Sequence, residues 1–162
     1  MKTIELEIKL MQYFDVQQNV IVPNVFNGIG IDYEADLVVL SKSGYATEIE
    51  IKTSKADLIK DKSKKNYHNS NLFKYLFFAV PESLKEVALQ EIPKNAGLFI
   101  VRKKMDIKRN GIIVTKEIFL ARPAIKNNNC LKWEEKQRVN LMRLGTMRIL
   151  GLKQKILKNQ VS

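Results

Sequence analysis

Charged and apolar side chains alternate in one short segment, which reads Glu48, Ile49, Glu50, Ile51 and Lys52. Such alternation predicts a strand with its three charged side chains on one face and both isoleucines on the other. Residues 34–40 form a second acidic strand candidate that contains Asp36, and the turn signal Gly44 lies between the two. The sequence therefore predicts a hairpin that brings Asp36 toward Glu50 and Lys52.

These residue types suit a divalent cation, which binds several hard oxygen ligands and keeps positions for water and substrate. Asp36, Glu50 and the backbone carbonyl of Ile51 can supply three of those ligands. A bound Mg²⁺ or Mn²⁺ lowers the pKa of a water molecule and polarises a phosphate. Lys52 can orient that water or neutralise developing negative charge, and Glu7 can act as an outer ligand or bind a second metal. The chemistry indicated is phosphodiester hydrolysis.

The structural alternative is an exposed hairpin face with Glu–Lys pairs, each worth about 0.3–1 kcal/mol. Glu-x-Lys alone occurs by chance in alternating charged strands, so the spacing by itself leaves both interpretations open. In either case Glu48 is expected to be a salt-bridge partner at the edge of the strand pair.

Cysteine and histidine counts limit the metals that the chain can hold. Cys130 and His68 are the single examples of their types, which excludes an internal disulfide, a cysteine-based zinc site and a histidine-rich site. No apolar run approaches the roughly 20 residues that span a bilayer, and the N-terminus lacks a signal-peptide core. We therefore expect an intracellular, cytoplasmic protein without a membrane segment.

The net charge of +11 is unevenly distributed. Residues 1–100 hold 12 Lys and Arg against 13 Asp and Glu, whereas residues 101–162 hold 16 against 4. An excess of +12 in one part suggests a polyanionic partner, with nucleic acid first and an anionic membrane second. The alternative is a basic, solvated face that keeps the protein soluble.

Periodicity predicts an α/β core with a mixed sheet flanked by helices over residues 1–102. The expected elements are a helix at 3–15, a strand at 19–23, the hairpin at 34–53, a helix at 55–65, a buried strand at 73–80, a helix at 82–90 and a strand at 97–101. Thr3 is expected to cap the first helix and Ser54 the second, with Asp57 completing a capping box. Pro23 is expected to stop the first strand.

Residues 103–162 are expected to form a basic, helical C-terminal extension packed on the core. Residues 106–120 suggest an extended pair that turns at Arg109-Asn110-Gly111. Residues 131–158 are predicted to be helical, in one or two pieces because Gly145 and Gly151 weaken a helix. An apolar stripe on that helix is expected to pack on the sheet, and comprises Val139, Met142, Thr146, Ile149 and Ile156.

Three sets of residues resemble the core of the PD-(D/E)xK nuclease superfamily: Glu7 on a helix, Glu-Ala-Asp36, and Glu50-Ile51-Lys52. Residues 48–57, 77–81 and 93–98 are similar to the MmcB-like DNA-repair family within it. The resemblance covers roughly residues 1–102. It departs from the superfamily at Ala35, where a proline is usual, but that proline is not a ligand.

The resemblance implies a restriction-endonuclease-like fold and Mg²⁺-dependent phosphodiester cleavage. It also implies that Asp36 and Glu50 are metal ligands and that Lys52 is the catalytic lysine. Glu5 is the rival to Glu7 for the helix glutamate.

The leading hypothesis is a metal-dependent DNA endonuclease that acts in repair, recombination or phage DNA processing. Side chains expected to contact the DNA backbone follow the acidic strand, and they are Lys55, Lys60, Lys64, Lys65 and His68. A DNA-binding protein without catalysis is the alternative, and a protein-interaction module is the third hypothesis. A two-fold homodimer would let two sites act on opposite strands, but the sequence does not require one.

Overall fold

The computed structural model describes residues 2–61, 70–108 and 111–161. Within this part of the chain, six strands form one sheet in the order β1-β2-β3-β4-β5-β6. The strands are β1 (Val20–Phe26), β2 (Glu34–Leu40), β3 (Ala46–Ile51), β4 (Phe73–Pro81), β5 (Gly97–Lys108) and β6 (Gly111–Arg122). The helices are α1 (Thr3–Tyr13), α2 (Lys55–Asp61), α3 (Lys85–Glu91) and α4 (Glu135–Val161), with a 3-10 turn, η1 (Glu82–Leu84), before α3.

The sheet is mixed, as the sequence predicted. β4 is parallel to both β3 and β5, and the other neighbouring strands pair antiparallel. The apolar run that forms β4 is therefore a central strand, which explains why it carries few polar residues. The α/β class and the helix-flanked mixed sheet are confirmed.

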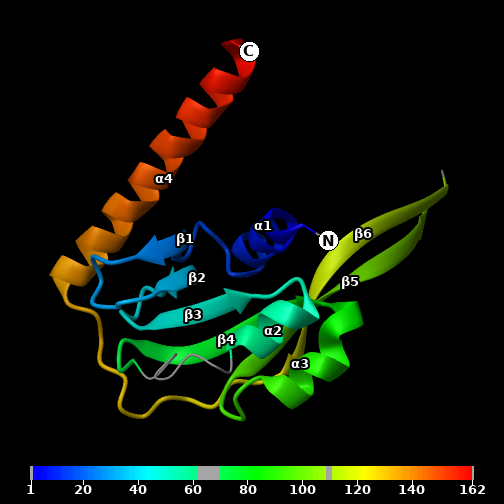
Figure 1. Ribbon diagram of the computed structural model, residues 1–162, viewed down its shortest axis with the longest axis horizontal. Helices are drawn as coiled ribbons and strands as arrows, with labels where there is room; N and C mark the ends of the chain where they lie inside the picture. The colour runs from blue at the N-terminus through cyan, green and yellow to red at the C-terminus, as the bar shows by residue number, and fades with distance from the viewer. Residues whose placement is uncertain (1, 62–69, 109–110, 162) are drawn as a thin grey trace.

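Helices cover both faces of the sheet (Figure 1). On one face, Leu6 and Leu10 of α1 pack in a cluster with Ile49 of β3. On the other face, α2 and α3 pack against β4 and β5 through Leu58 and Ala88. The start of α4 covers β1 and β2 on that second face. Since side chains alternate along β3, Glu48 and Glu50 point to the second face.

The first helix and the first strand differ from expectation at their ends. Thr3 is the first residue of α1 rather than its cap, and the preceding Lys2 donates its backbone N–H to Glu5. The helix ends at Tyr13 because Asp15 has a left-handed backbone, with φ of 56°. Pro23 does not stop β1, because an edge strand has only one partner and tolerates a missing N–H donor.

The second helix begins as predicted, whereas β5 is longer than the sequence suggested. Ser54 caps α2 as predicted, since its Oγ accepts the N–H of Asp57 at 3.2 Å. The compositional change after Arg102 lies inside β5, so the sheet continues across it. Beyond Val101, β5 pairs with β6 alone, and this hairpin projects from the sheet in Figure 1. Its predicted turn residues, 109 and 110, lie outside the described residues.

Helix α4 runs without a break through Gly145 and Gly151. It is anchored by Leu141, which is fully buried, and by Leu144. The expected apolar stripe is wrong, because Met142, Ile149 and Ile156 are each about half exposed. The C-terminal half of α4 projects away from the sheet (Figure 1). Across the described residues, no helix combines the length and the hydropathy that crossing a bilayer requires.

Candidate functional site

The hairpin of β2 and β3 brings Asp36 to the end of β3. Residue pairing between the strands extends to Leu37 and Ile49, and Asp36 is the next residue of β2. Its Oδ2 accepts the backbone N–H of Ile51 at 2.7 Å. Beyond the last paired residues, the Asp36 carboxylate, rather than a backbone carbonyl of β2, accepts the hydrogen bond from β3. This bond fixes the position of the carboxylate beside β3.

Lys52 joins the two carboxylates. Its Nζ lies 2.7 Å from Glu50 Oε2 and 3.8 Å from Asp36 Oδ2. The Lys52 backbone N–H donates to the carbonyl of Ala79 at 3.0 Å, so the residue after β3 stays attached to β4. The structure therefore brings Asp36, Glu50 and Lys52 together on one face, as the hairpin prediction required.

Burial differs among the three side chains. Glu50 is fully buried and Lys52 is 8% exposed, whereas the Asp36 side chain is 32% exposed. Burial raises the pKa of Glu50 to about 7; the Asp36 charge adds to the rise and Lys52 opposes it. The exposed-face interpretation of the hairpin is wrong, because the charged face of β3 lies inside the molecule. Asp36 is the member of the cluster that solvent reaches.

The two candidate helix glutamates have different surroundings. Burial raises the pKa of Glu7, and the charge of Asp36 adds to that rise, so the two carboxyl groups are within electrostatic range. Glu5 instead accepts a hydrogen bond from Lys116 Nζ at 2.9 Å, which lowers the pKa of its carboxyl. Glu7 is therefore the helix carboxylate that interacts electrostatically with Asp36 of the candidate site.

The donor set can be compared with the needs of a divalent cation. Among the described residues, no group of three or more His, Cys, Asp and Glu side chains is arranged to hold a metal ion. Asp36 and Glu50 supply two hard oxygen ligands, which suits Mg²⁺ or Mn²⁺ bound through one or two carboxylates with several waters retained. A second positive charge would also relieve the repulsion that raises the Glu50 pKa. The residues fit such an ion.

Glu48 and Tyr33 form a second polar contact on this face. Glu48 is 1% exposed, so it is buried rather than placed at an edge as predicted. It accepts a hydrogen bond from the Tyr33 hydroxyl at 3.1 Å, and the pKa of Tyr33 is raised by burial and by that carboxylate. The sequence analysis missed Tyr33, because it precedes β2 in a loop that carries no periodic signal.

The candidate DNA-binding residues are placed only in part. Lys55 and Lys60 are exposed on α2, which begins three residues after Lys52. Lys64, Lys65 and His68 lie outside the described residues. Two lysines of the expected set therefore lie near the end of β3 in the chain.

By its fold, the chain is an α/β protein with a mixed sheet. A solved structure with this arrangement is SPO1766, a protein of unknown function from Silicibacter pomeroyi, with a TM-score of 0.61 and 18% sequence identity. The alignment covers 99% of this chain and 94% of that one. At this identity the likeness concerns the fold alone. No family model matches the chain, and no curated protein matches it.

Proposed function

We propose that the protein is a metal-dependent DNA nuclease with a restriction-endonuclease-like core of the PD-(D/E)xK type, related to the MmcB-like repair proteins. One observation carries the proposal: the Lys52 ammonium lies within 3.8 Å of both carboxylates at the end of β3. A lysine held between two acidic groups on one strand end matches what Mg²⁺-dependent hydrolysis of a phosphodiester needs.

The roles follow from position and exposure. Asp36 and Glu50, with the backbone carbonyl of Ile51, would hold Mg²⁺ or Mn²⁺, which activates water and polarises the phosphate when bound. Lys52 donates hydrogen bonds to the negative oxygens that develop there. Glu7 would act as an outer ligand or bind a second metal, because its carboxyl group is in electrostatic range of Asp36.

DNA is the proposed substrate because of the charge distribution. The excess of +12 in residues 101–162 attracts a polyanion. Lys55 and Lys60, exposed on α2 just after Lys52 in the chain, would contact DNA phosphates near the site. Phosphate contacts of this kind position a strand without reading its sequence.

The decisive experiment is incubation with supercoiled, linear, single-stranded and branched DNA, with Mg²⁺, with Mn²⁺ and with EDTA. We expect cleavage only with a divalent ion, and a loss of about a thousandfold or more in Asp36→Asn and Lys52→Met. The asparagine in Asp36→Asn keeps an oxygen that can accept the Ile51 N–H, so the fold should survive, as circular dichroism can check. Glu34→Gln is the matched control, because Glu34 is an exposed acid on the same face of β2. Cleavage at the parent rate by both site variants would refute the proposal.

A DNA-binding protein without catalysis is the second candidate. The basic C-terminal region favours it independently of the carboxylates, since its charge lies outside the candidate site. Tight, salt-sensitive DNA binding with no cleavage under Mg²⁺ or Mn²⁺ would support this function in place of the nuclease.

A further inference from the structure

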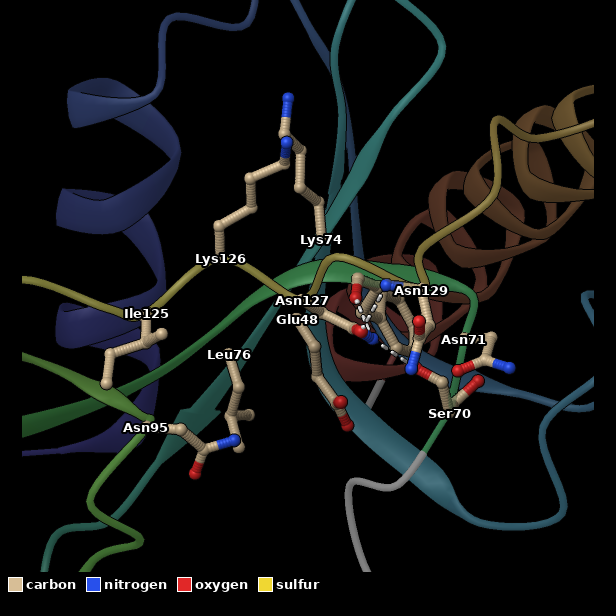
Figure 2. A pocket seen from close by; sticks show the side chains of 11 residues that line it. Glu48, Ser70, Asn71, Lys74, Leu76, Asn95, Ile125, Lys126, Asn127 and Asn129 are labelled. Atoms are coloured by element: carbon tan, nitrogen blue, oxygen red, sulfur yellow. Dashed lines mark hydrogen bonds between the residues drawn. The ribbon is translucent and has the colours of Figure 1, made fainter.

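A pocket of about 250 Å³ opens on the same sheet face as Glu50 (Figure 2). Its walls come from β3, β4, the segment before β4, the loop between α3 and β5, and the connection between β6 and α4. The lining residues are Glu48, Ser70, Asn71, Phe73, Lys74, Leu76, Asn95, Ile125, Lys126, Asn127 and Asn129. Most of them are polar, which is unusual for a cavity that only separates packed elements.

Glu48 is the buried charge in this pocket. It is 1% exposed, and Tyr33 donates a hydrogen bond to one of its oxygens. In Figure 2 its carboxylate points between Leu76 and Asn95 on one side and Ser70 on the other. An ionised carboxylate only accepts hydrogen bonds, so a ligand that reaches Glu48 in this pocket must offer a donor.

The side chain of Asn127 stabilises the wall of the pocket rather than offering a binding surface. Its side-chain amide donates to the carbonyls of Ser70 and Phe73, and its side-chain oxygen accepts the N–H of Asn129. These bonds hold the connection against the start of β4, so the pocket is preformed. The exposed amides of Asn71 and Asn95 take no part in those wall contacts and can meet a ligand.

Size and charge restrict the ligand. Pockets for drug-sized molecules measure about 300–1,000 Å³, so this one suits a smaller planar group. Lys74 and Lys126 extend in the same direction, away from Glu48, in Figure 2. Lys74 Nζ lies 4.2 Å from the centre of the Tyr45 ring. The pocket thus has a polar floor and a cationic rim, which is the arrangement expected for a base with its phosphate outside.

We propose that this pocket binds one unpaired nucleobase of a DNA strand, and that it favours bases with an exocyclic amino group over thymine. The Glu48 carboxylate accepts hydrogen bonds from an exocyclic amino group, whereas thymine offers only an N3–H that is flanked by two carbonyl oxygens, which the carboxylate repels. Asn71 and Asn95 can both donate and accept, and Leu76 supplies apolar contact. The inference rests on the proposed function, because it takes DNA as the polymer that carries the base.

The position of Glu48 connects base binding with the candidate site. Glu48 and Glu50 are one side-chain repeat apart on β3, which separates them by about 7 Å along the strand. A base held by Glu48 therefore lies on the strand and the sheet face that carry Glu50 of the candidate site. Holding an unstacked base costs least in single-stranded or damaged DNA, so the pocket would select such substrates.

The test measures binding in EDTA, where cleavage does not contribute. Fluorescence anisotropy would compare labelled oligo(dA), oligo(dC) and oligo(dT) on the full chain. We expect oligo(dA) and oligo(dC) to bind about tenfold more tightly than oligo(dT). In Glu48→Gln the amide can donate to a thymine carbonyl, so the preference should shrink or reverse.

Two further variants keep the result interpretable. Asn95 is exposed, so Asn95→Ala should fold and should weaken oligo(dA) and oligo(dC) binding more than oligo(dT) binding. Glu34→Gln removes an exposed carboxylate from β2 and should leave the preference unchanged. Equal affinity for all three oligomers would overturn the inference. It would mean that the pocket is only a space between packed elements. Cleavage with Mn²⁺ without base preference would refute this inference alone, and preference without cleavage would refute the nuclease alone.

Discussion

Asp36, Glu50 and Lys52 place two negative charges and one positive charge in a largely buried site. Removing carboxylates from water is expensive unless a partner compensates, and the single Lys52 ammonium offsets two carboxylates only in part. Burial, with the Asp36 charge adding to it, therefore raises the pKa of Glu50. A site with excess negative charge at neutral pH is suited to binding a cation, and it makes the fold sensitive to pH.

The first prediction concerns pH in EDTA. The pKa of Glu50 is about 7 in the folded chain, against an ordinary value of 4.5. Between these values the folded chain holds a proton that the unfolded chain has released, so rising pH favours unfolding. The free energy of unfolding should fall by up to about 3 kcal/mol between pH 4.5 and pH 7, and then stop falling. Urea titrations at a series of pH values measure it.

Glu50→Gln should remove most of this slope, because glutamine does not titrate. The matched variant Glu34→Gln should retain it, since Glu34 is exposed on β2. Equal slopes in the two variants would show that the pH dependence comes from other groups.

The second prediction concerns divalent ions without DNA. A ligand that binds only the folded chain stabilises it by about 2.7 kcal/mol at a hundred times its Kd. Mg²⁺ or Mn²⁺ should therefore raise the Tm at pH 8. Asp36→Asn should abolish the rise, because it removes one of the two carboxylate ligands while an oxygen remains for the Ile51 N–H. An unchanged rise in Asp36→Asn would place the ion elsewhere.

Which site residues could be predicted depended on their local pattern. Asp36, Glu50 and Lys52 could be predicted, because a two-residue period and a short turn fix the faces on which their side chains lie. Tyr33 could not be predicted, because its contact with Glu48 joins a loop to a strand, and the alternation of residues along the strand does not reveal that contact. The depth of Glu48 and Glu50 was also missed, since α2, α3 and the start of α4 cover that face through long-range packing.

At the scale of the elements, the parallel pairing of β4 and β5 depends on Gly97. A Cβ added there would lie 2.3 Å from two atoms of the Phe77 ring and 2.8 Å from the backbone nitrogen of Ala124. Phe77 cannot move away easily, because it stacks on Phe99 with ring centres 4.6 Å apart. Gly97→Ala should therefore destabilise the chain by about 1–3 kcal/mol, as thermal or urea unfolding can measure.

Gly151→Ala is the comparison for that variant. A Cβ at Gly151 meets nothing within 4 Å, and alanine favours a helix over glycine by up to about 1 kcal/mol. This change should be neutral or stabilising. If the two substitutions had equal effects, close packing at Gly97 would not be the reason for its glycine.

The elements themselves were predictable wherever the apolar period was strong. β4 and the hairpin of β2 and β3 were found with nearly correct bounds, because β-branched and aromatic runs are bounded by turn residues. Pro23 misled the prediction, since local propensity does not reveal an edge position. The glycines of α4 left one or two helical pieces open, and the structure has one.

At the scale of the whole molecule, two projections carry many of the basic residues of positions 101–162. The hairpin of β5 and β6 and the distal half of α4 leave opposite ends of the sheet in Figure 1, and β3 ends on the side of the hairpin. The structural likeness to SPO1766 covers 99% of the chain and concerns the fold alone. The family resemblance in the sequence ends near residue 102, because the projections are rich in charged residues and contain no motif of that family.

The last prediction concerns the distal half of α4. Lys153, Lys155 and Lys158 are exposed there. If they contact phosphates, changing all three to glutamine should reduce the slope of log affinity for duplex DNA against log salt by up to about 0.9 per lysine. Stability should change little, because these side chains cover no core. Binding isotherms at several salt concentrations, in EDTA, would measure the slope.

A second triple variant separates position from net charge. Replacing Lys2, Lys9 and Lys42 with glutamine lowers the charge of the chain by the same amount, on α1 and in the turn between β2 and β3. If only the α4 variant flattens the slope, the projecting helix lies on the DNA. Equal flattening in both would mean that overall charge, rather than this helix, draws the polyanion, because a diffuse field depends on total charge and not on direct phosphate contacts.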